Sequence, residues 1–554
     1  MRLTGAQILV KELIALGVDE IFGYPGGSVL DIYDELYKNR DKIKHYITAH
    51  EQGAAHAADG YARRSGRTGV VLATSGPGAT NLVTGIATAY LDSVPLVAIT
   101  GNVSTKLIGK DSFQEVNIVG ITMPVTKHNY IVERVSDLRK ILREAFFIAN
   151  DGRPGPVLID IPKDIQRDSA EYDEAESFTF TSRRHASDFK IEKVCAMLKA
   201  AKRPYIYAGG GAVISGASSE LRAFSERIDA PVATSLMGVT AVPASFSGAL
   251  GMAGMHGRYA ASKALAECDL LIAVGVRFSD RATGNKDMFV KNCKVLQFDI
   301  DRAEVNKNIK ADEYVVGGIK EILSGILRVL PKLDNKDWLD YVSVLKGSPE
   351  NLLATSDNAL TPKFVIENTC ESIGRGASVA TDVGQHQMWT AQYYRFEEPR
   401  TFITSGGLGT MGYGMGAAIG ACIGSKKKRS ILFTSDGSFH MNLNELATAV
   451  TNELPLTVVL LDNNALGMVR QWQTMFYDKH YSETALNRKT DYVKLAEAFG
   501  AKGFGAKNKE EFLAALRAVR DLDTPALIHC TIDSDENVFP MIPPNGTIND
   551  IIIR

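Results

Sequence analysis

Residues 431–464, ILFTSDGSFHMNLNELATAVTNELPLTVVLLDNN, contain two apolar runs, and polar residues follow each of them. Asp436 follows the first run, and Asn463 follows the second, 27 positions later. The stretch between them, Asn442 to Asn452, has the composition of a helix. This order predicts two parallel strands joined by a crossover helix, which brings Asp436 and Asn463 to the carboxyl edge of one sheet, where α/β proteins bind ligands.

A carboxylate and an amide oxygen at that edge suit Mg²⁺, which prefers oxygen ligands and usually shares its shell with water and a substrate phosphate. The spacing resembles the metal-binding motif of thiamine diphosphate enzymes. In that family a backbone carbonyl two residues past the Asn also binds the metal, here that of Ala465. The motif usually opens with Gly, and this chain has Ser435 there.

The bulk composition is that of an ordinary globular protein. With 554 residues the chain is too long for one core, so about three domains are expected. The net charge of −2 gives no electrostatic footprint for nucleic acid or an anionic membrane. The six cysteines are scattered without a CxxC pair, which argues against a zinc site or a disulfide framework and indicates a reducing cytosol.

Two charge-free stretches, residues 69–91 and 403–425, exceed the length of a membrane span. Both are rich in Gly, Ser, Thr and Asn, so we interpret them as buried α/β turns. The chain enters a helix almost at once, because Thr4 and Gln7 form a capping-box pattern. No targeting pattern precedes that helix, which predicts a cytoplasmic protein.

The alternation of strand and helix patterns predicts an α/β fold with three doubly wound parallel-sheet domains. We place the domains at residues 1–166, 190–332 and 361–554. Two polar stretches, 167–190 and 334–358, are predicted to be linkers. The first and third domains resemble each other in the layout of strands and helices.

Glu51 opens a predicted helix directly after a predicted strand at residues 44–48. Taken alone, it is a solvated first-turn acid favoured by the helix dipole. The small residues 53–55 that follow suggest close packing, which would desolvate the carboxyl group and favour its protonated form. Thiamine chemistry needs a carboxyl hydrogen-bonded to N1′ of the pyrimidine ring, whose N4′ nitrogen then removes the thiazolium C2 proton. In the family the Glu after the strand has this role, and Glu51 matches it.

Eight glycines lie between Gly406 and Gly424. A flexible linker is one interpretation, but the interspersed large apolar residues favour burial, and glycine lets the backbone approach a planar cofactor closely. The resemblance implies that this region and residues 383–386 surround the thiamine rings, and that a helix starting after Ser438 offers N–H groups to the diphosphate. The implied thiamine diphosphate contacts are Glu51, Val383, Gly384, Gln385, His386, Gly409, Met411, Gly437, Ser438 and Met468.

A narrower resemblance extends nearly from end to end. The chain is similar to the catalytic (large) subunits of the acetolactate synthase, or acetohydroxyacid synthase, family. A generic thiamine enzyme would share few of the motifs that carry this likeness: 24–27 (YPGG), 113–115 (FQE), 126–130 (TKHNY), 152–156 (GRPGP), 162–166 (PKDIQ), 254–257 (GMHG), 276–278 (VRF), 280–281 (DR), 467–469 (GMV), 471–472 (QW) and 540–543 (PMIP).

The glycine trio 209–211 follows a predicted strand, but it lacks the GxGxxG spacing and by itself indicates only a turn. The resemblance implies that the central domain holds FAD in a structural role. The positions that match the family's FAD contacts are Arg153, Gly210, Gly211, Thr234, Leu236, Met255, His256, Gly275, Arg277, Asp280, Asp299 and Ile300.

Arg281 and Trp472 are the predicted substrate-side residues. A guanidinium binds a carboxylate through two parallel hydrogen bonds, and the family uses this Arg for the second 2-ketoacid. Trp472 and Met468 are four residues apart on a predicted helix and could shape a pocket for a small aliphatic ketoacid. The other implied active-site positions are Gly27, Phe113, Gln114 and Lys163.

The resemblance implies that pyruvate is decarboxylated and its two-carbon unit is joined to pyruvate or 2-oxobutyrate, giving 2-acetolactate or 2-aceto-2-hydroxybutyrate for branched-chain amino acid biosynthesis. It also implies Mg²⁺, a homodimer or homotetramer in which Glu51 of one subunit faces Asp436 of another, and a small regulatory subunit as a possible partner.

Three alternatives stay open at this point. A pyruvate oxidase or another thiamine lyase would share the fold and the cofactor motifs. A nicotinamide dehydrogenase rests only on Gly209–Gly211. A non-catalytic binding protein is disfavoured because Glu51, Asp436 and Asn463 are all present.

Overall fold

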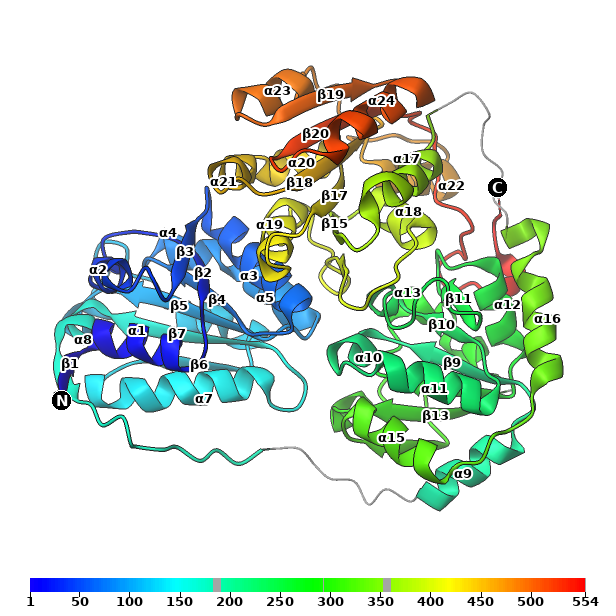
Figure 1. Cartoon of the computed structure of the whole chain (residues 1–554), viewed down its shortest axis with the longest axis horizontal. Helices are drawn as coiled ribbons and strands as arrows, with labels where there is room; N and C mark the ends of the chain where they lie inside the picture. The colour runs from blue at the N-terminus through cyan, green and yellow to red at the C-terminus, as the bar shows by residue number, and fades with distance from the viewer. Residues whose placement is uncertain (183–190, 292, 352–359, 554) are drawn as a thin grey trace.

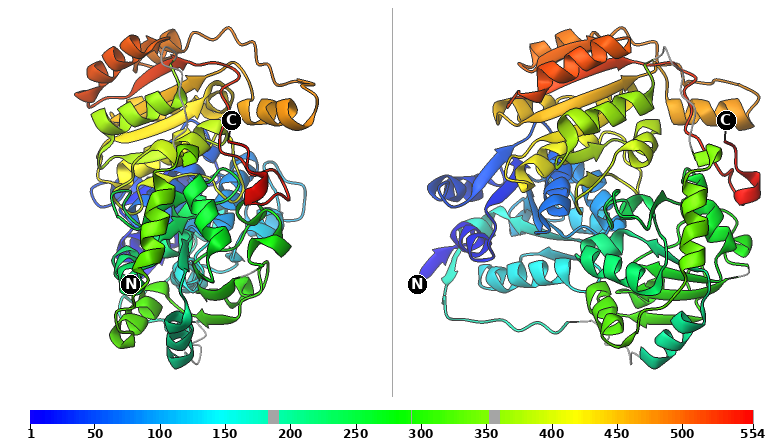
Figure 2. Two further views of the ribbon diagram at one scale, coloured as in Figure 1. Left: turned by 90° about the vertical axis from the view of Figure 1, so that its right-hand side faces the viewer. Right: turned by 45° about the vertical axis from the view of Figure 1, so that its right-hand side comes forward.

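The fold is given by a computed structural model, which describes residues 1–182, 191–291, 293–351 and 360–553. Three parallel sheets of six strands form the centres of three domains (Figure 1). The C-terminal domain, yellow to red, lies above the other two in Figure 1 and in both views of Figure 2. The predicted fold class, α/β with three doubly wound domains, is confirmed.

The N-terminal sheet has the strand order β3-β2-β4-β5-β7-β6, and all its neighbours are parallel. Its strands are β2 (Glu20–Tyr24), β3 (Lys44–Ile47), β4 (Gly69–Ala73), β5 (Leu96–Asn102), β6 (His128–Ile131) and β7 (Pro156–Pro162). Its helices are α1 (Gly5–Ala15), α2 (Leu30–Lys38), α3 (Glu51–Ser65), α4 (Pro77–Asn81), α5 (Val83–Leu91), α6 (Ile118–Thr122), α7 (Leu138–Asn150) and α8 (Lys163–Arg167).

The C-terminal sheet, β16-β15-β17-β18-β20-β19, repeats this topology strand for strand, as the sequence layout suggested. Its strands are β15 (Ser378–Thr381), β16 (Phe402–Ile403), β17 (Ser430–Ser435), β18 (Leu456–Asp462), β19 (Lys502–Ala506) and β20 (Ala526–Thr531). Its helices are α17 (Pro362–Thr369), α18 (Gln385–Tyr393), α19 (Gly414–Gly424), α20 (Asp436–Asn442), α21 (Glu445–Thr451), α22 (Gly467–Phe476), α23 (Tyr492–Ala498) and α24 (Lys509–Arg520).

The central sheet has a different order, β11-β10-β9-β12-β13-β14. Successive strands are added toward one edge up to β11 and then toward the other edge from β12 onward, so the order reverses between β9 and β12. This is the strand order of dinucleotide-binding folds. Its strands are β9 (Pro204–Ala208), β10 (Val232–Thr234), β11 (Ala249–Met252), β12 (Leu270–Val274), β13 (Lys294–Asp299) and β14 (Glu313–Val316). Its helices are α9 (Ile191–Ala200), α10 (Gly210–Ile214), α11 (Ser218–Ile228), α12 (Tyr259–Glu267), α13 (Asp280–Thr283), α14 (Lys286–Phe289) and α15 (Ile319–Val329).

Local sequence explains where the key elements begin and end. α1 starts with the expected capping box, in which Thr4 and Gln7 cap each other. α3 starts because the His50 ring accepts a hydrogen bond from the Gln52 N–H, and it ends at Gly66, whose φ of 75° suits glycine. The inner strands β4, β5 and β7 are buried along their whole length, which is why they read as continuous apolar runs.

Helices α3 and α19 join the N-terminal and C-terminal domains at almost backbone-to-backbone distance. A Cβ added at Gly420 would lie 1.8 Å from the Ala57 carbonyl oxygen, and one at Gly60 would lie 2.2 Å from that of Ala417. Only glycine fits at such approaches. The glycine-rich stretch is therefore a packed helix interface, and the flexible-linker interpretation is wrong.

A buried ion cluster supports this interface. Arg63 on α3 contacts Asp59 at 2.6 Å and Asp92 at 3.0 Å, and all three side chains are nearly or fully buried. Arg63 also donates to the Thr404 carbonyl, while Asp92 accepts the backbone N–H groups of Gly406 and Gly407. Because the three charged groups are paired with one another and further hydrogen-bonded, the cluster ties the two domains together at a fixed position.

Both predicted linkers contain secondary structure. Within 167–190, β8 (Ser169–Glu171) pairs with β1 (Arg2–Thr4) in an antiparallel ribbon. Within 334–358, α16 (Lys336–Lys346) packs through Trp338 on the central domain. The linker interpretation was wrong there because surface helices and edge strands are polar enough to resemble loops. Residues 183–190 and 352–359 lie outside the described part.

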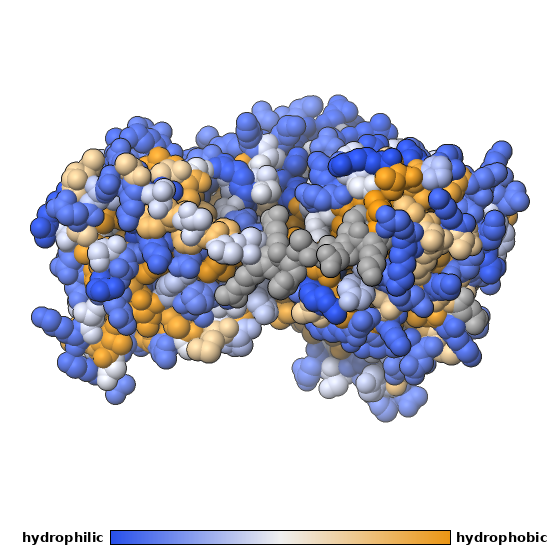
Figure 3. Space-filling model, turned by 90° about the horizontal axis from the view of Figure 1, so that it is seen from below, coloured by the Kyte–Doolittle hydropathy of each residue, from blue (hydrophilic) through white to orange (hydrophobic). Residues whose placement is uncertain are grey.

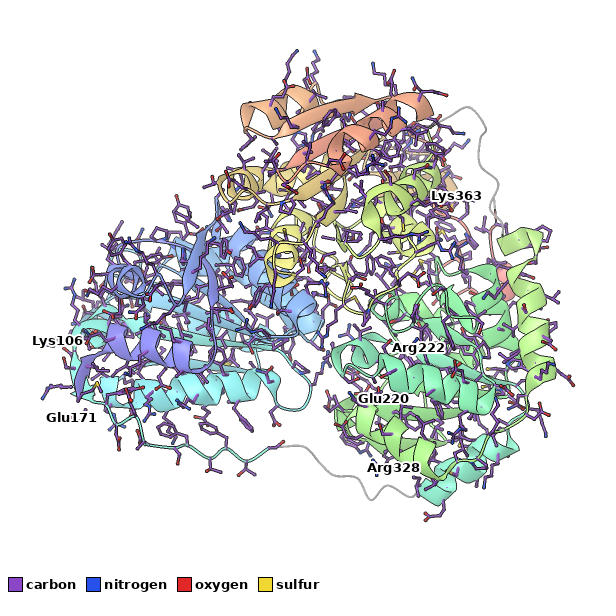
Figure 4. All side chains as sticks on the ribbon, in the orientation of Figure 1. Lys106, Glu171, Glu220, Arg222, Arg328 and Lys363 are labelled. Atoms are coloured by element: carbon purple, nitrogen blue, oxygen red, sulfur yellow. The ribbon has the colours of Figure 1, made fainter. Side chains whose placement is uncertain are left out.

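The surface carries charged side chains of both signs. Figure 3 shows the underside as mostly hydrophilic, with small apolar groups on the N-terminal lobe at the left. Figure 4 labels charged side chains on all three domains: Lys106, Glu171, Glu220, Arg222, Arg328 and Lys363. Among the described residues, no helix is both long and apolar enough to span a membrane.

We expect Gly420→Ala to destabilise the protein. Alanine gains about 1 kcal/mol of helix propensity, but overpacking typically costs about 1–3 kcal/mol, and here the new methyl meets a backbone oxygen that cannot rotate away. The midpoint of thermal unfolding should fall by several degrees. Gly505→Ala on β19 is the matched control, since its nearest neighbour would lie 3.8 Å away. Equal midpoints for both variants would contradict the packing account.

Candidate functional site

Asp436 lies at the carboxyl end of β17, as predicted, and begins helix α20. It is 1% exposed, and neither carboxylate oxygen accepts a hydrogen bond of good geometry from the described residues. Burial, together with the charge of Asp462 beside it, raises the pKa of Asp436 to about 7. Burying a carboxylate without a partner is energetically costly unless a cation binds it, so Asp436 has the properties expected of a metal ligand.

The surrounding polar groups hold Asp436 by its backbone. Its carbonyl oxygen lies 2.8 Å from Nδ1 of His440 and accepts from Arg488 at 2.9 Å. The register of β17 and β18 pairs Ser435 with Leu461, which places Asp462 next to Asp436. His529 lies 2.8 Å from Asp462, and this contact lowers the pKa of Asp462 although burial opposes it. Asp462 therefore stays ionised beside the Asp436 carboxyl.

The loop after β18 presents further oxygens to the same place. Asn463 donates to Gln385 at 3.3 Å, and its amide oxygen accepts the N–H of Ala465 at 3.2 Å. Asn464 adopts φ of 53°, which turns the chain sharply at this point. A small cavity of about 460 Å³ is lined by both Asp436 and Asn463, so the structure brings the two predicted metal ligands together.

The helix after the first motif begins earlier than predicted. α20 starts at Asp436 itself, two residues before Ser438, and it is followed by a second short helix, α21. The expectation of one helix at 442–452 was wrong at its start, because Asp and Ser also cap helices at their first turn. Ser435 has an extended backbone, φ of −127°, which any residue can adopt, so glycine is not required there.

A single cavity of about 1500 Å³ runs between the three domains and collects most of the predicted thiamine residues. Its lining includes Val383, Gly384, Gln385, His386, Gly409, Met411, Asn463, Ala465 and Met468. Gly437 and Ser438 do not line the cavity. Ser438 contacts a lining residue, because its hydroxyl donates to the Val383 carbonyl at 3.2 Å. Burial lowers the pKa of His386 to about 3, so its ring is neutral.

Arg281 and Trp472 line the same cavity and touch each other. The Arg281 guanidinium lies 5.3 Å from the centre of the Trp472 ring, which is cation–π distance. Trp472 and Met468 project from one helix, α22, as their spacing predicts. A cation held against an aromatic wall can bind a small carboxylate whose other end is apolar.

The predicted FAD residues gather at the switch point of the central sheet. Gly209–Gly211 follow β9, and Gly275 follows β12. The two turns touch, because a Cβ added at Gly275 would lie 2.6 Å from the Gly211 Cα, and Gly275 has φ of 61°. The cavity lining includes Arg153, Gly210, Gly211, Leu236, Met255, His256, Gly275, Arg277, Asp280, Asp299 and Ile300. Thr234 is buried behind the wall and does not line the cavity.

Two guanidinium groups give this end of the cavity positive character. Burial, and then the charge of Arg153, lower the pKa of Arg277. Arg277 donates to the Leu91 carbonyl, while Arg153 is paired with Glu304 at 2.8 Å. Burial raises the pKa of Asp299 to about 6. An anionic group such as a diphosphate would relieve the repulsion between the two cations.

Several cavity-lining polar atoms are buried without a hydrogen-bond partner in the described chain. They are the hydroxyl of Tyr207, Nδ1 of His256, Oε2 of Glu304 and Nε2 of His386. Burial and the nearby Arg281 lower the pKa of His256 to about 4. Buried polar groups normally find partners, so this set fits a large polar ligand in the cavity. The donors and oxygens present therefore suit thiamine diphosphate, a divalent cation and a dinucleotide.

Five predicted catalytic residues do not line this cavity. Gly27, Glu51, Phe113, Gln114 and Lys163 all follow carboxyl ends of strands in the N-terminal sheet, so they share a different edge. Lys163 donates to the Gly27 carbonyl at 2.8 Å, and Glu51 is half-buried and accepts from Asn81 at 2.9 Å. Phe113 is 88% exposed. Within one chain, the predicted site is thus divided between two faces.

Sequence analysis missed three residues of the site. Tyr207 lies in strand β9 together with a second tyrosine, Tyr205, so the strand offers no local contrast that marks it. Asp462 directly precedes Asn463, but its pairing with His529 joins positions 67 residues apart and has no local signal. A lone His near the end of the chain carries no pattern from which this contact could be predicted.

Comparison with known proteins agrees with this geometry. Residues 3–121 match the family model described as "Thiamine pyrophosphate enzyme, N-terminal TPP binding domain". Residues 191–326 match the central domain of the same enzymes, and residues 382–530 match their C-terminal TPP binding domain. The probable acetolactate synthase large subunit of Methanocaldococcus jannaschii is 44% identical over 99% of this chain and 95% of its own length.

The chain belongs to the acetolactate synthase large-subunit family. The acetolactate synthase large subunit of Corynebacterium glutamicum is 44% identical over 99% of this chain and 90% of its own length. The acetolactate synthase isozyme 2 large subunit of Escherichia coli is 43% identical over 99% of both chains. Membership of this family makes the chain a thiamine pyrophosphate-dependent enzyme. The dehydrogenase and binding-protein alternatives are set aside, and the pyruvate oxidase alternative gains no support.

We expect Asp436→Asn to weaken Mg²⁺-dependent binding of thiamine diphosphate by at least about 100-fold, the upper end of the loss caused by changing an outer group of a metal site. The substitution keeps the shape and removes the charge that holds the cation. Calorimetric titration with thiamine diphosphate in excess Mg²⁺ measures the change. Asp523→Asn, exposed in the same domain, is the control. Unchanged affinity in Asp436→Asn would remove this residue from the metal site.

Proposed function

We propose that this enzyme decarboxylates pyruvate and joins the two-carbon unit to a second 2-ketoacid, pyruvate or 2-oxobutyrate, in branched-chain amino acid biosynthesis. The observation that carries the proposal is the unpartnered, buried Asp436 carboxylate, which lines a small cavity together with Asn463. Asn463 also lines the larger cavity, to which Arg281 and Trp472 contribute. Thiamine diphosphate, when bound, supplies the nucleophilic carbon and the electron sink.

Asp436, Asn463 and the Ala465 carbonyl would hold Mg²⁺, and the ion would bind the diphosphate of the cofactor. Residues 383–386, Gly409, Met411 and Met468 would surround its rings. The glycines allow close approach of the backbone, and the apolar side chains exclude water from the reacting carbon.

Arg281 would orient the second ketoacid by its carboxylate, and Trp472 with Met468 would contact its short alkyl group. The pocket side chains are large, so a ketoacid with a small aliphatic group fits best.

We further propose that the active site is shared between two subunits. The carboxyl edge of the N-terminal sheet lies outside the cavity of its own chain. The residues that follow this edge are Glu51, Gln114, Phe113, Lys163 and Gly27. Placed against the cavity of a second copy, this edge would bring the Glu51 carboxyl to the pyrimidine N1′, and it would cover the exposed Phe113 ring. A two-fold dimer, or a tetramer built from such dimers, satisfies this arrangement.

Glu51→Gln should lower turnover by about 10²–10⁴-fold, the usual contribution of a group that moves or holds a proton, while thiamine diphosphate still binds. Acetolactate formation from pyruvate measures turnover, and calorimetry measures binding. Glu171→Gln, an exposed glutamate of the same domain, is the control.

Mixing the two inactive variants tests the shared site directly. A heterodimer of Glu51→Gln with Asp436→Asn contains one intact site if each site draws on both chains. With random exchange of subunits, half of the dimers are heterodimers and each has one intact site of two, so the mixture should recover up to about a quarter of the wild-type rate. If both groups act within one chain, no activity returns, and the shared-site proposal is wrong although the reaction itself can still stand.

FAD is the third proposed cofactor, in a structural role in the central domain. Support comes from the sheet order, the touching glycine turns, and the neighbouring guanidinium groups of Arg153 and Arg277, where burial and then the charge of Arg153 lower the pKa of Arg277. The flavin would have no net redox task, because the reaction neither gains nor loses electrons.

Arg277→Ala should reduce flavin retention by about 10-fold or more, because a charged hydrogen bond to a phosphate contributes about 1.5–3 kcal/mol. The visible absorbance of the purified protein and of the released flavin measures occupancy. Arg222→Ala, exposed on α11, should retain the wild-type spectrum. A colourless wild-type protein that is active without added flavin would contradict the FAD assignment.

A small regulatory subunit is the proposed protein partner, since relatives covering the full length are named large subunits. We infer a cytoplasmic location, which is supported by six cysteines that form no disulfide in the structure.

A further inference from the structure

Two cysteines that are far apart in the sequence meet in the central domain. Sγ of Cys268 lies 3.2 Å from Sγ of Cys293, and the two residues are 25 positions apart. Cys268 ends α12 just before β12, and Cys293 directly precedes β13. Because β12 and β13 are parallel neighbours, with Lys294 N donating to the Asp269 carbonyl at 3.0 Å, both thiols are held at the amino edge of the sheet.

The two thiols differ in access. Cys268 is buried at 3% exposure, whereas Cys293 is only partly buried. The hydrogen bond with Cys293, and then burial, raise the pKa of Cys268 well above its usual value. A small reagent therefore reaches the Cys293 thiol first, and the buried Cys268 thiol can react only afterwards.

We propose that Cys268 and Cys293 form a thiol–disulfide modification site that reacts with low-molecular-weight disulfides. The Cys293 thiolate attacks one sulfur of the reagent and releases one small thiol, which leaves a mixed disulfide on Cys293. Cys268 then loses its proton, attacks Sγ of Cys293, and expels the second small thiol. The two protein thiols are oxidised, one reagent disulfide is reduced to two thiols, and atoms and electrons balance.

The movement required is small. A disulfide needs the sulfurs about 2.05 Å apart, so the pair must close by roughly 1 Å. The backbone already holds the two cysteines close together, because the strands that follow them, β12 and β13, are hydrogen-bonded to each other. Among the described residues, no contact joins Cys195, a buried cysteine on α9, to another thiol, so Cys195 serves as an internal reference.

The bridge would enclose a functionally important segment. The chain between the two cysteines carries Gly275, Arg277, Asp280 and Arg281, the side of the cavity that faces the proposed flavin and second ketoacid. A disulfide stabilises mainly by restricting the unfolded chain, so oxidation should raise the free energy of unfolding. The sulfurs lie at the amino edge of the sheet and the cavity at its carboxyl edge, so turnover should change little.

Incubation of the full-length protein with oxidised glutathione, followed by peptide mass mapping, tests the proposal. The wild-type protein should lose two hydrogen atoms in mass, yield one cross-linked peptide pair containing Cys268 and Cys293, and gain a few degrees in thermal midpoint that dithiothreitol reverses. Cys195→Ser should behave like the wild type.

The single variants distinguish the order of events. Cys268→Ser should stop at a stable glutathione adduct on Cys293, whereas Cys293→Ser should react at least about 10-fold more slowly than wild type because its remaining thiol is buried. Six unmodified thiols after treatment of the wild type, or a glutathione adduct on Cys293 that never resolves, would overturn the proposal. Neither result depends on catalytic activity.

Discussion

The close contact between α3 and α19 is the constraint on which the rest of the structure depends. It allows two domains of the same topology to pack with their helix backbones almost touching, and the buried Arg63 cluster fixes them at that distance. The same helix α3 carries Glu51 at its first residue. Backbone N–H groups of Ala49 and His50 donate to Glu445 at the start of α21, so the beginning of α3 is held against its own C-terminal domain.

This arrangement explains why the cavity of one chain lacks its proposed acid. The proposed metal ligands follow strands at the carboxyl edge of the C-terminal sheet, and the proposed acid, Glu51, follows a strand at the carboxyl edge of the N-terminal sheet. The α3–α19 contact keeps those two edges on different faces within one chain. In the proposed dimer a second copy would supply the Glu51 carboxyl, and this separation of the two edges is the physical basis of the shared-site proposal.

Much of the fold follows from the sequence because local signals agree with one another. The apolar strands with polar ends and the crossover of the right length predict the sheet edge and the positions of Asp436 and Asn463. The capping box predicts the start of α1. The helix α16 and the ribbon strand β8 were mistaken for linkers because their outer faces are polar. The Asp462–His529 contact and the Cys268–Cys293 contact could not be predicted, since each joins distant positions that only the sheet register brings together.

The most direct measurement of the central claim is the anomalous scattering of Mn²⁺ in crystals grown with thiamine diphosphate, because Mn²⁺ takes the same oxygen ligands as Mg²⁺. The account predicts one strong peak within coordination distance of Asp436, Asn463 and the Ala465 carbonyl, with the Glu51 carboxyl of a neighbouring subunit at the pyrimidine ring. A peak elsewhere, or a pyrimidine ring that no Glu51 reaches, would contradict it.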